Sequence, residues 1–305
     1  MNNNMNILVT GGAGFIGKHL VKYLLEKDYV VTIFDNFSNS KKKSLSNLIK
    51  LGAKIIEGDI RKIEDIQNAS INQNVIIHLA AKISVPESIK NPIETFQNNI
   101  DGTKNVLIAS KRNSVEKIIS ASSAAVYGVS GPNMKLTEDI DMKPISPYGE
   151  SKRRMELKIK EFEIKNGVNC IILRFFNIYG IGQTPEYSGV ITKFIERIRE
   201  NKSLKIFGNG LQTRDFVAID DVIHSIHNAI IYGKSGTYNI ASGNVTTIKE
   251  IAELMILMNG KKLDIEYTKE QKGDIKNSHA DISLAKKEIK YFPKCKLDKI
   301  KEMLE

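Results

Sequence analysis

The sequence predicts an α/β fold organised around a doubly wound parallel sheet with helices on both faces. In the first half of the chain, short β-branched runs alternate with helical patterns, which is typical of βαβ units. A glycine-rich turn follows the first of these runs and leads into the first helical pattern, as in a Rossmann-type sheet. Beyond residue 177 the loops lengthen and glycine, proline and asparagine become frequent, which indicates a smaller, discontinuous α/β domain.

The expected strands and helices predict how the chain divides into two domains. Strands are predicted from apolar runs at residues 6–10, 30–34, 55–57, 75–78, 117–120 and 169–174. Helices are predicted at residues 15–26, 63–68, 93–111, 147–165 and 220–232. The last helix is expected to return to the main sheet, so the large domain comprises residues 1–176 plus about 214–237, and the small domain 177–213 plus 238–305. The helices at 93–111 and 147–165 carry apolar stripes, and we expect them to face a partner subunit.

The composition is that of a globular protein with a basic surface. Of the 305 residues, 41% are hydrophobic and 26% charged, and no apolar run is long enough to span a bilayer. The lysines behind the formal charge of +10 are spread along the chain, with one short run at 41–43 in an expected loop, which favours a solvated surface over nucleic-acid binding. Two cysteines and a start without the layout of a signal peptide favour a cytoplasmic protein without a disulfide framework. We therefore expect neither a nucleic acid nor a membrane as a partner.

The glycine-rich turn is the first candidate binding site. Gly11, Gly14 and Gly17 lie between a predicted strand and a predicted helix, where glycines allow the backbone to approach a pyrophosphate closely. Phe15 and Ile16 open the helix, whose N-terminus offers free N–H groups to the anion. A glycine turn without a ligand is the alternative interpretation.

Two carboxylates follow the next two strands. Asp35 ends the second predicted strand, where a carboxylate accepts the ribose hydroxyls of a dinucleotide and repels a 2′-phosphate. This position favours NAD over NADP. Asp59, after the third strand, is a candidate for the adenine edge or, alternatively, a simple helix cap.

Tyr148 and Lys152 form the candidate catalytic pair. Ser146 and Pro147 suit the cap and the first position of a helix, so Tyr148 and Lys152 share one helix face. A free phenol has a pKa of about 10, which is too high for a base at neutral pH. A nearby ammonium, the helix N-terminus and the positive charge of an oxidised nicotinamide favour the phenolate, which can take a proton from a substrate hydroxyl. An ordinary surface pair is the alternative for this spacing.

Two serines follow the strand predicted at residues 117–120. Residues at the carboxyl ends of parallel strands face the ligand crevice, where a hydroxyl can hold a substrate oxygen and relay its proton. We predict Ser123 as the catalytic serine, with Ser122 as the second candidate. Tyr127 is either structural or a substrate contact.

These motifs resemble the extended short-chain dehydrogenase/reductase family and, within it, the nucleotide-sugar 4-epimerases of the UDP-glucose 4-epimerase type. The resemblance runs from residue 6 to about residue 290 and implies NAD as the cofactor, a UDP-sugar as the substrate and a homodimer. Besides the glycine turn and the catalytic pair, it implies cofactor contacts in four short segments. These residues are Asp35, Asn36, Asn39, Asp59, Ile60, Leu79, Ala80, Ala81, Lys82 and Asn98. His78, beside them, is expected to be a packing histidine at a strand end.

The resemblance also implies a substrate site in the second half of the chain. Besides Ser123, the implied contacts are Asn177, Val190, Phe207, Gln212, Arg214, Asp274 and Ser278. Arg214 is implied as the main diphosphate cation, which suits a guanidinium because it binds phosphate oxygens through two parallel donors. The chain departs from the family at Gln271, where a second arginine is usual, and Lys269 or Lys272 replaces it less well than a planar fork.

Two alanines narrow the reaction that the resemblance implies. Related 4,6-dehydratases carry an acid pair directly after the catalytic serine or threonine, and decarboxylating relatives carry a glutamate there. This chain has Ala124 and Ala125, which favours 4-epimerisation through a transient 4-keto sugar. A small Ser278, where relatives have a bulky aromatic residue, predicts room for N-acetyl groups, although it could merely cap a turn. UDP-glucuronate 4-epimerase, a 4,6-dehydratase and a non-catalytic NAD-binding scaffold stay open as alternatives.

Overall fold

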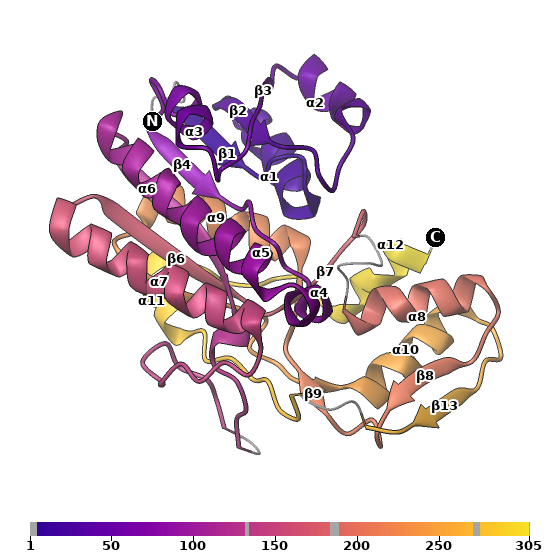
Figure 1. Cartoon of the computed structure of the whole chain (residues 1–305). Coiled ribbons are helices and arrows are strands. Elements are labelled where there is room, and N and C mark those ends of the chain that lie inside the picture. The colour runs from indigo at the N-terminus through magenta and orange to yellow at the C-terminus, as the bar shows by residue number, and fades with distance from the viewer. Residues whose placement is uncertain (1–4, 132–133, 184–188, 271–274, 305) are drawn as a thin grey trace.

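The computed structural model describes residues 5–131, 134–183, 189–270 and 275–304 (Figure 1). Within these residues a parallel sheet of seven strands forms the centre, in the order β11-β6-β5-β4-β1-β2-β3. The strands are β1 (Asn6–Thr10), β2 (Val30–Asp35), β3 (Lys54–Glu57), β4 (Val75–His78), β5 (Lys117–Ser123), β6 (Asn169–Phe175) and β11 (Gly236–Ile240). The order reverses between β1 and β4, so the carboxyl ends of these strands open the crevice where doubly wound sheets bind ligands. The predicted fold class is confirmed.

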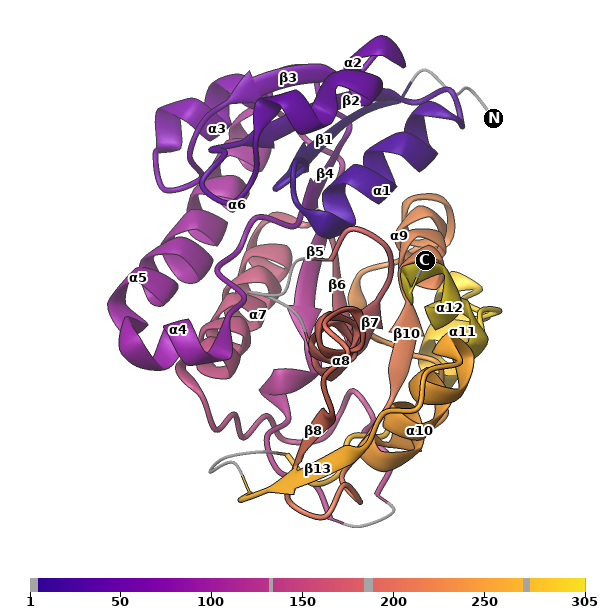
Figure 2. The same cartoon turned by 90° about the vertical axis from the view of Figure 1, so that its right-hand side faces the viewer.

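Both faces of this sheet are buried, as the near-continuous apolar sequence of parallel strands requires. Along β1, Ile7 and Val9 belong to one hydrophobic core and Leu8 to another. On the first face lie α1 (Phe15–Leu25), α9 (Ile219–Tyr232) and α11 (Ser283–Ile289). On the second face lie α3 (Ile63–Ala69), α6 (Gly102–Arg112) and α7 (Pro147–Asn166), as Figure 2 shows.

A second, smaller core lies beside the sheet. It joins α8 (Val190–Arg199), α10 (Ile248–Asn259) and α12 (Lys301–Leu304) to the parallel pair β8 (Leu204–Phe207) and β13 (Ile265–Thr268). The chain leaves the large sheet through β7 (Asn177–Tyr179) and returns through β10 (Phe216–Ala218), which pair in parallel. Strand β9 (Thr213–Arg214), just before β10 in the chain, pairs antiparallel with β12 (Thr246–Thr247).

The helix predicted over residues 93–111 is present as a continuous helical stretch, but it contains a π-helical turn that the sequence did not predict. The structure has α4 (Val85–Lys90), α5 (Pro92–Phe96), a π-helical turn over Gln97–Asp101 and then α6. The Asn99 side chain, in the π turn, accepts a hydrogen bond from the Lys82 backbone N–H at 2.8 Å and donates to Ser151 Oγ at 2.9 Å. A π turn adds one residue to a helical turn, and such turns are frequent at functional sites.

Three segments differ in smaller ways from the predicted elements. Strand β5 continues beyond residue 120 to Ser123. The basic run begins a 3-10 helix, Lys42–Leu45, followed by α2 (Ser46–Lys50), instead of lying in an open loop. Strand β11 extends to Ile240 in the large sheet, and α11 packs on the same face, although the expected division gives residues 238–305 to the small domain.

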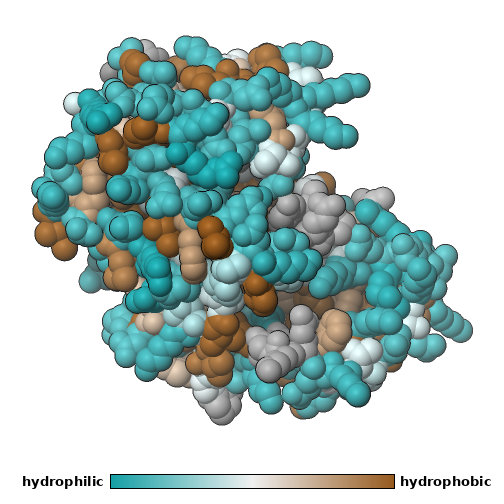
Figure 3. Space-filling model, viewed as in Figure 1, coloured by the Kyte–Doolittle hydropathy of each residue, from teal (hydrophilic) through white to brown (hydrophobic). Residues whose placement is uncertain are grey.

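The surface matches a chain rich in lysine. The face seen in Figure 3 is mostly hydrophilic, with hydrophobic residues in small groups. In the part of the chain that the structure describes, no helix is long and apolar enough to cross a bilayer.

Candidate active site

The glycine turn is packed so tightly that side chains are excluded from two of its positions. Gly11 has φ +69°, and a Cβ there would lie 2.7 Å from the Ala80 backbone nitrogen. A Cβ on Gly17 would lie 2.4 Å from the Gly11 carbonyl oxygen. Gly14 is the N-cap residue of α1 and makes no side-chain hydrogen bond to the helix. The first turn of α1, all of which the structure describes, carries no acidic residue. The turn therefore presents backbone N–H groups at a helix N-terminus, as an anionic phosphate requires.

Asp35 lies directly against this turn. Its carboxylate accepts hydrogen bonds from the backbone N–H groups of Ala13 at 3.0 Å and Phe37 at 2.8 Å. Burial raises the pKa of Asp35, and these two hydrogen bonds oppose the rise. Each carboxylate oxygen keeps a second lone pair, so Asp35 can also accept a ribose hydroxyl.

Asp59 is held by its own neighbours. Arg61 Nη2 lies 2.6 Å from Asp59 Oδ2, and Asn36 Nδ2 donates to the same oxygen at 3.2 Å. The Arg61 hydrogen bonds are the main reason that the pKa of Asp59 falls to about 2. Asp59 does not cap α3, whose cap position is Lys62. Ile60, next to it, is buried against Gly102.

The segment 79–82 follows β4 on the other side of the turn. The backbone N–H of Ala80 donates to Thr10 Oγ1 at 3.3 Å, and the Lys82 backbone is clamped by Asn99. The Lys82 ammonium pairs with Glu94 at 3.0 Å, so its side chain is held toward α5. His78 lies buried between Thr10 and Thr103, and burial lowers its pKa to about 3, which suits a neutral packing histidine.

Asn98 gives a direct test of whether a ligand fits here. Its side chain is buried, and its Oδ1 has no hydrogen-bond partner among the described residues. A buried acceptor without a partner costs about 1–3 kcal/mol. A donor on a bound ligand would satisfy it. Together with the open helix N-terminus and the excluded Cβ atoms, this fits the dinucleotide that the sequence predicts.

Tyr148, Lys152 and Ser123 lie together at the carboxyl end of β5. Ser146 Oγ caps α7 by accepting the Gly149 N–H at 3.0 Å, which places Tyr148 in the first turn. Tyr148 and Lys152 are buried on the same helix face, and Ser123 is near enough to the Tyr148 phenol to act on its pKa. The Lys152 ammonium donates to the Ala121 carbonyl at 2.8 Å. These are the groups that the sequence brought together as a catalytic constellation.

Burial acts against charge at both members of the pair. It raises the pKa of Tyr148, and Ser123 opposes the rise. It also lowers the pKa of Lys152 to about 8, against the opposite effect of Glu156. The sequence argument named the ammonium, the helix N-terminus and an oxidised nicotinamide as favouring the phenolate, whereas burial, which opposes it, is the largest influence in the structure. The phenol therefore needs a further positive charge beside it before it acts as a base at neutral pH.

A buried ionic network that the sequence analysis did not single out lies behind this pair. Ser122 Oγ donates to Glu156 at 2.5 Å, so this second serine candidate is already committed. Arg174 pairs with Glu156 at 2.7 Å and donates to the Tyr127 hydroxyl at 2.8 Å. Tyr127 in turn donates to Asn239 at 2.6 Å, which assigns Tyr127 a structural role. The one signal in the sequence was the spacing of Glu156, four residues after Lys152.

The residues predicted for the substrate lie in the second half of the site. Asn177 opens β7, and its N–H donates to the backbone carbonyl of Asp215 at 3.1 Å, directly beside Arg214. Val190 is the first residue of α8. Ser278 is buried. Asp274 and Gln271 lie outside the described residues.

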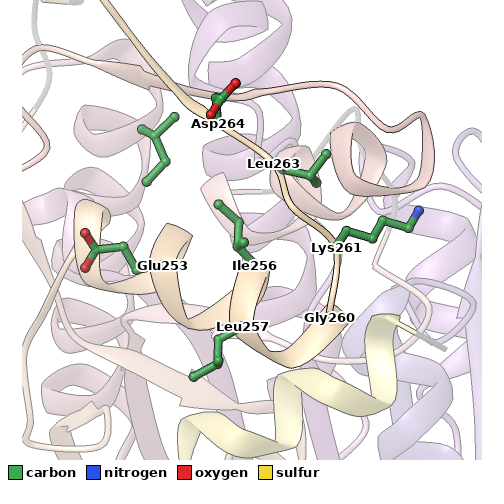
Figure 4. Close-up of a pocket in the computed structure, with 8 residues that line it drawn as sticks. Glu253, Ile256, Leu257, Gly260, Lys261, Leu263 and Asp264 are labelled. Atoms are coloured by element: carbon green, nitrogen blue, oxygen red, sulfur yellow. The ribbon is translucent and has the colours of Figure 1, made fainter.

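Phe207 and Gln212 line one hollow of about 230 Å³, together with Gly208, Asn209, Leu211, Glu270, Lys276 and Asn277. Gln212 Nε2 donates to the Phe207 carbonyl at 2.8 Å, which links the two sides of the hollow. A wider hollow of about 560 Å³ lies elsewhere, between the end of α10 and the start of β13. Figure 4 shows that the charged side chains of Glu253, Lys261 and Asp264 do not converge there. Of these two hollows, only the smaller is lined by residues predicted for the substrate, Phe207 and Gln212.

Proteins of known family resemble this chain in sequence and in structure. The profile of the NAD dependent epimerase/dehydratase family matches residues 7–241. A putative UDP-glucose 4-epimerase from Methanocaldococcus jannaschii is 38% identical over 283 residues, which are 92% of this chain and 90% of that protein. A UDP-glucose 4-epimerase from Thermotoga maritima, solved with UDP-glucose, has a TM-score of 0.93 at 33% identity, covering 98% of this chain and 97% of that one.

A UDP-N-acetylglucosamine 4-epimerase from Methanobrevibacter ruminantium, solved with UDP-N-acetylmuramic acid, has a TM-score of 0.91 at 37% identity. The match covers 99% of this chain and 96% of that one. Related structures of the same fold contain bound NAD. The chain therefore belongs to the NAD-dependent epimerase/dehydratase family, as an extended short-chain dehydrogenase/reductase enzyme with NAD as its cofactor.

Proposed function

We propose that this enzyme catalyses the 4-epimerisation of a UDP-sugar, interconverting UDP-glucose and UDP-galactose and also their N-acetylated counterparts. The observation that carries the proposal is the placement of Ser123, Tyr148 and the buried Lys152 together, at the strand ends that also carry the glycine turn. All three side chains lie where a doubly wound sheet exposes its ligand crevice.

The chain's own residues supply acid–base chemistry. NAD, when held by the glycine turn and Asp35, would supply the hydride acceptor and donor and, in its oxidised form, the positive charge that the buried phenol lacks. Tyr148 takes the proton of the sugar 4-hydroxyl and later returns it, while Ser123 holds the same oxygen. The Lys152 ammonium lies one helical turn from the phenol and favours its ionised form.

Ala124 and Ala125 argue against elimination. They follow Ser123 in a short 3-10 helix, and the Ala125 N–H donates to Ser123 Oγ at 3.2 Å. A 4,6-dehydratase needs a proton donor and acceptor in this place, and a methyl group is neither. Rotation of the 4-keto sugar and reduction on its other face then complete an epimerisation.

For the cofactor, the glycine turn would hold the pyrophosphate and Asp35 the ribose. Further contacts would come from the segments around Asn36, Asn39 and Asp59, from 79–82, and from Asn98. For the substrate, Arg214 and Asn177 would bind the diphosphate, and Val190, Phe207 and Gln212 the uracil end. Asp274 would meet the nucleotide ribose, and Ser278 the sugar. The M. ruminantium relative, named for an N-acetylated substrate, supports the wider substrate range.

The direct test is to incubate the purified protein with each UDP-sugar without added NAD. We expect the 4-epimer of UDP-glucose and of UDP-N-acetylglucosamine, read by chromatography or NMR. Tyr148→Phe is the matched variant, because it removes only the phenol oxygen. The rate of conversion should fall by about 10²–10⁴-fold, while NAD stays bound. Accumulation of a dehydrated 4-keto product, or full activity of Tyr148→Phe, would contradict the proposal.

We also propose that two copies assemble into a dimer through the 92–112 stretch and α7, and that the chain divides into an NAD-binding and a sugar-nucleotide-binding domain. Largely exposed apolar side chains on these helices support the first of these: Ile93 on α5, and Leu157 and Ile164 on α7. The separate hydrophobic core of α8, α10 and α12 supports the second.

A further inference from the structure

Asp215 is a fully buried carboxylate that accepts hydrogen bonds from two other segments of the chain. Its Oδ1 accepts from the Ser242 backbone N–H at 2.8 Å and from Ser242 Oγ at 2.7 Å. Its Oδ2 accepts from the Gly243 N–H at 3.1 Å and the Ala280 N–H at 3.3 Å. The mechanism proposed above does not use this group.

Besides residues 242–243, the segments that meet Asp215 each carry a residue proposed for the substrate. Arg214 directly precedes it in the chain. Asn177 donates its N–H to the Asp215 carbonyl at 3.1 Å. Ser278 lies two residues before Ala280, in the segment that Asp215 holds through its carboxylate. Segments 27 to 65 residues away in the chain thus converge on Asp215: residues 242–243 and Ala280 on its carboxylate, and Asn177 on its backbone carbonyl.

We propose that Asp215 is a positioning residue for substrate binding. Its carboxylate holds residues 242–243 and Ala280, and its backbone carbonyl holds Asn177, so that this residue fixes Arg214, Asn177 and Ser278 relative to one another. This inference rests on the proposed UDP-sugar function. An ionised carboxylate suits the task because it accepts at both oxygens and donates at neither, so four donors can be satisfied at once. A loosened clamp would misplace the guanidinium without touching Tyr148, Lys152 or the glycine turn.

The ionisation of Asp215 gives a signature that a merely structural role lacks. Burial raises its pKa to about 6, while the hydrogen bonds from Ser242, Ala280 and Gly243 oppose the rise. Other ionisable groups around it are Arg214, His279, whose Nε2 lies 3.2 Å from the Gly243 carbonyl, and Tyr291, whose pKa Asp215 helps to raise. When the pH falls through about 6, the Asp215 carboxylate becomes protonated, and its new O–H group then lies among the four groups that donate hydrogen bonds to it. KM should then rise on the acid side.

Asp221 offers a matched control. It is a second buried aspartate whose two oxygens accept backbone N–H groups, from Lys294 at 2.9 Å and Cys295 at 3.0 Å. These partners follow α11 and carry no residue proposed for the substrate. In both Asp215→Asn and Asp221→Asn, an NH₂ group faces backbone donors in place of an accepting oxygen. Both variants should therefore lose thermal stability, and only one should lose substrate affinity.

The experiment measures three quantities on the NAD-containing protein: the Kd of UDP by calorimetry, and kcat and KM for the best UDP-sugar between pH 5 and 8. For Asp215→Asn we expect Kd and KM to rise about 10-fold at pH 7.5, with kcat within about threefold and NAD content unchanged. Its KM should no longer rise on acidification. Asp221→Asn should keep the wild-type KM. If Asp215→Asn does not fold, Ser242→Ala, which removes one hydrogen bond to Asp215, should raise KM about threefold.

Equal effects of Asp215→Asn and Asp221→Asn on KM, or a fall in kcat at unchanged KM, would overturn the inference. UDP binding separates it from the reaction assigned above. If the wild-type protein binds UDP but epimerises no UDP-sugar, the proposed reaction is refuted. If Asp215→Asn then binds UDP more weakly than the wild type, the positioning role stands. A wild-type protein that binds no UDP would refute both.

Discussion

Side-chain size at residue 278 is expected to set the range of sugars that the enzyme accepts. Ser278 is buried, and the segment around it is fixed on both sides: Ser130 Oγ donates to the Asn277 carbonyl at 2.7 Å, and the Ala280 N–H donates to Asp215. The backbone at this point is therefore not free to move away from a larger side chain. A phenol ring introduced here would occupy the space that an N-acetyl group needs.

Ser278→Tyr should lower kcat/KM for the N-acetylated pair of UDP-sugars by about 10–100-fold, while the UDP-glucose pair changes by less than about threefold. The steric reason applies to only one pair, so the ratio of the two kcat/KM values is the measurement. Ser278→Ala is the control and should keep the wild-type ratio. An equal loss on both pairs, with a lowered Tm, would mean that residue 278 acts through folding alone.

The elements around the catalytic helix are tied by the buried Glu156–Arg174 pair. Glu156 lies on α7 and Arg174 on β6, and through Ser122 and Tyr127 they reach the end of β5 and the segment after it. Two buried charges cost much desolvation, so their value lies in the geometry that they fix and not in net stability. Here that geometry keeps the helix face of Lys152 against the end of β5.

Arg174→Met should destabilise the protein by about 3–5 kcal/mol, because it leaves the Glu156 carboxylate buried and without its cation. The double variant Glu156→Met/Arg174→Met should recover a large part of this loss, since neither charge then remains. Urea unfolding measures both. Arg154→Met, which breaks an exposed pair with Glu150, should cost less than about 1 kcal/mol. Additive losses in the double variant would show that the pair is not coupled.

How far the sequence predicts an element depends on whether local information decides it. Strands β1 and β4 were predicted residue for residue, because apolar side chains on both faces leave few other conformations. The site residues Ser123 and Tyr148 were predicted because each lies at a recognisable element end. The π turn was missed, since its Asn99 is bonded to residues 17 and 52 positions away. Buried charges such as Asp215 were missed for the same reason.

On the scale of the whole molecule, the site lies where the two hydrophobic cores meet. The groups proposed for the cofactor gather at the ends of β1, β2 and β4, and those proposed for the substrate lie on β7, β9 and the segment before residue 280. Between them, Asp215 joins the end of β11 to that segment, so the large sheet itself supports part of the substrate pocket. The predicted division at residue 238 did not foresee this, because the burial of α11 against the sheet appears only in the folded chain.

The surface opposite α1 and α9 is where a second copy is expected to bind. Helix α5 packs against α7, and Ile93, Leu157 and Ile164 are 68%, 45% and 87% exposed. A stable dimer buries about 1,200–2,000 Å² with an apolar centre. These side chains would supply that centre. Light scattering should then give about 68 kDa, twice the chain mass of 34.2 kDa.

Replacement of two apolar residues at the centre of this surface by glutamate should dissociate the dimer. In Leu157→Glu/Ile164→Glu, burial of two carboxylates per chain would cost more than an interface gains, so the mass should fall to 34.2 kDa. Leu257→Glu is the matched control: this leucine is 78% exposed on α10, at the hollow of Figure 4, and its replacement should leave the mass unchanged. A wild-type mass of one chain at every concentration would remove the dimer. Dissociation by Leu257→Glu would instead move the interface to α10.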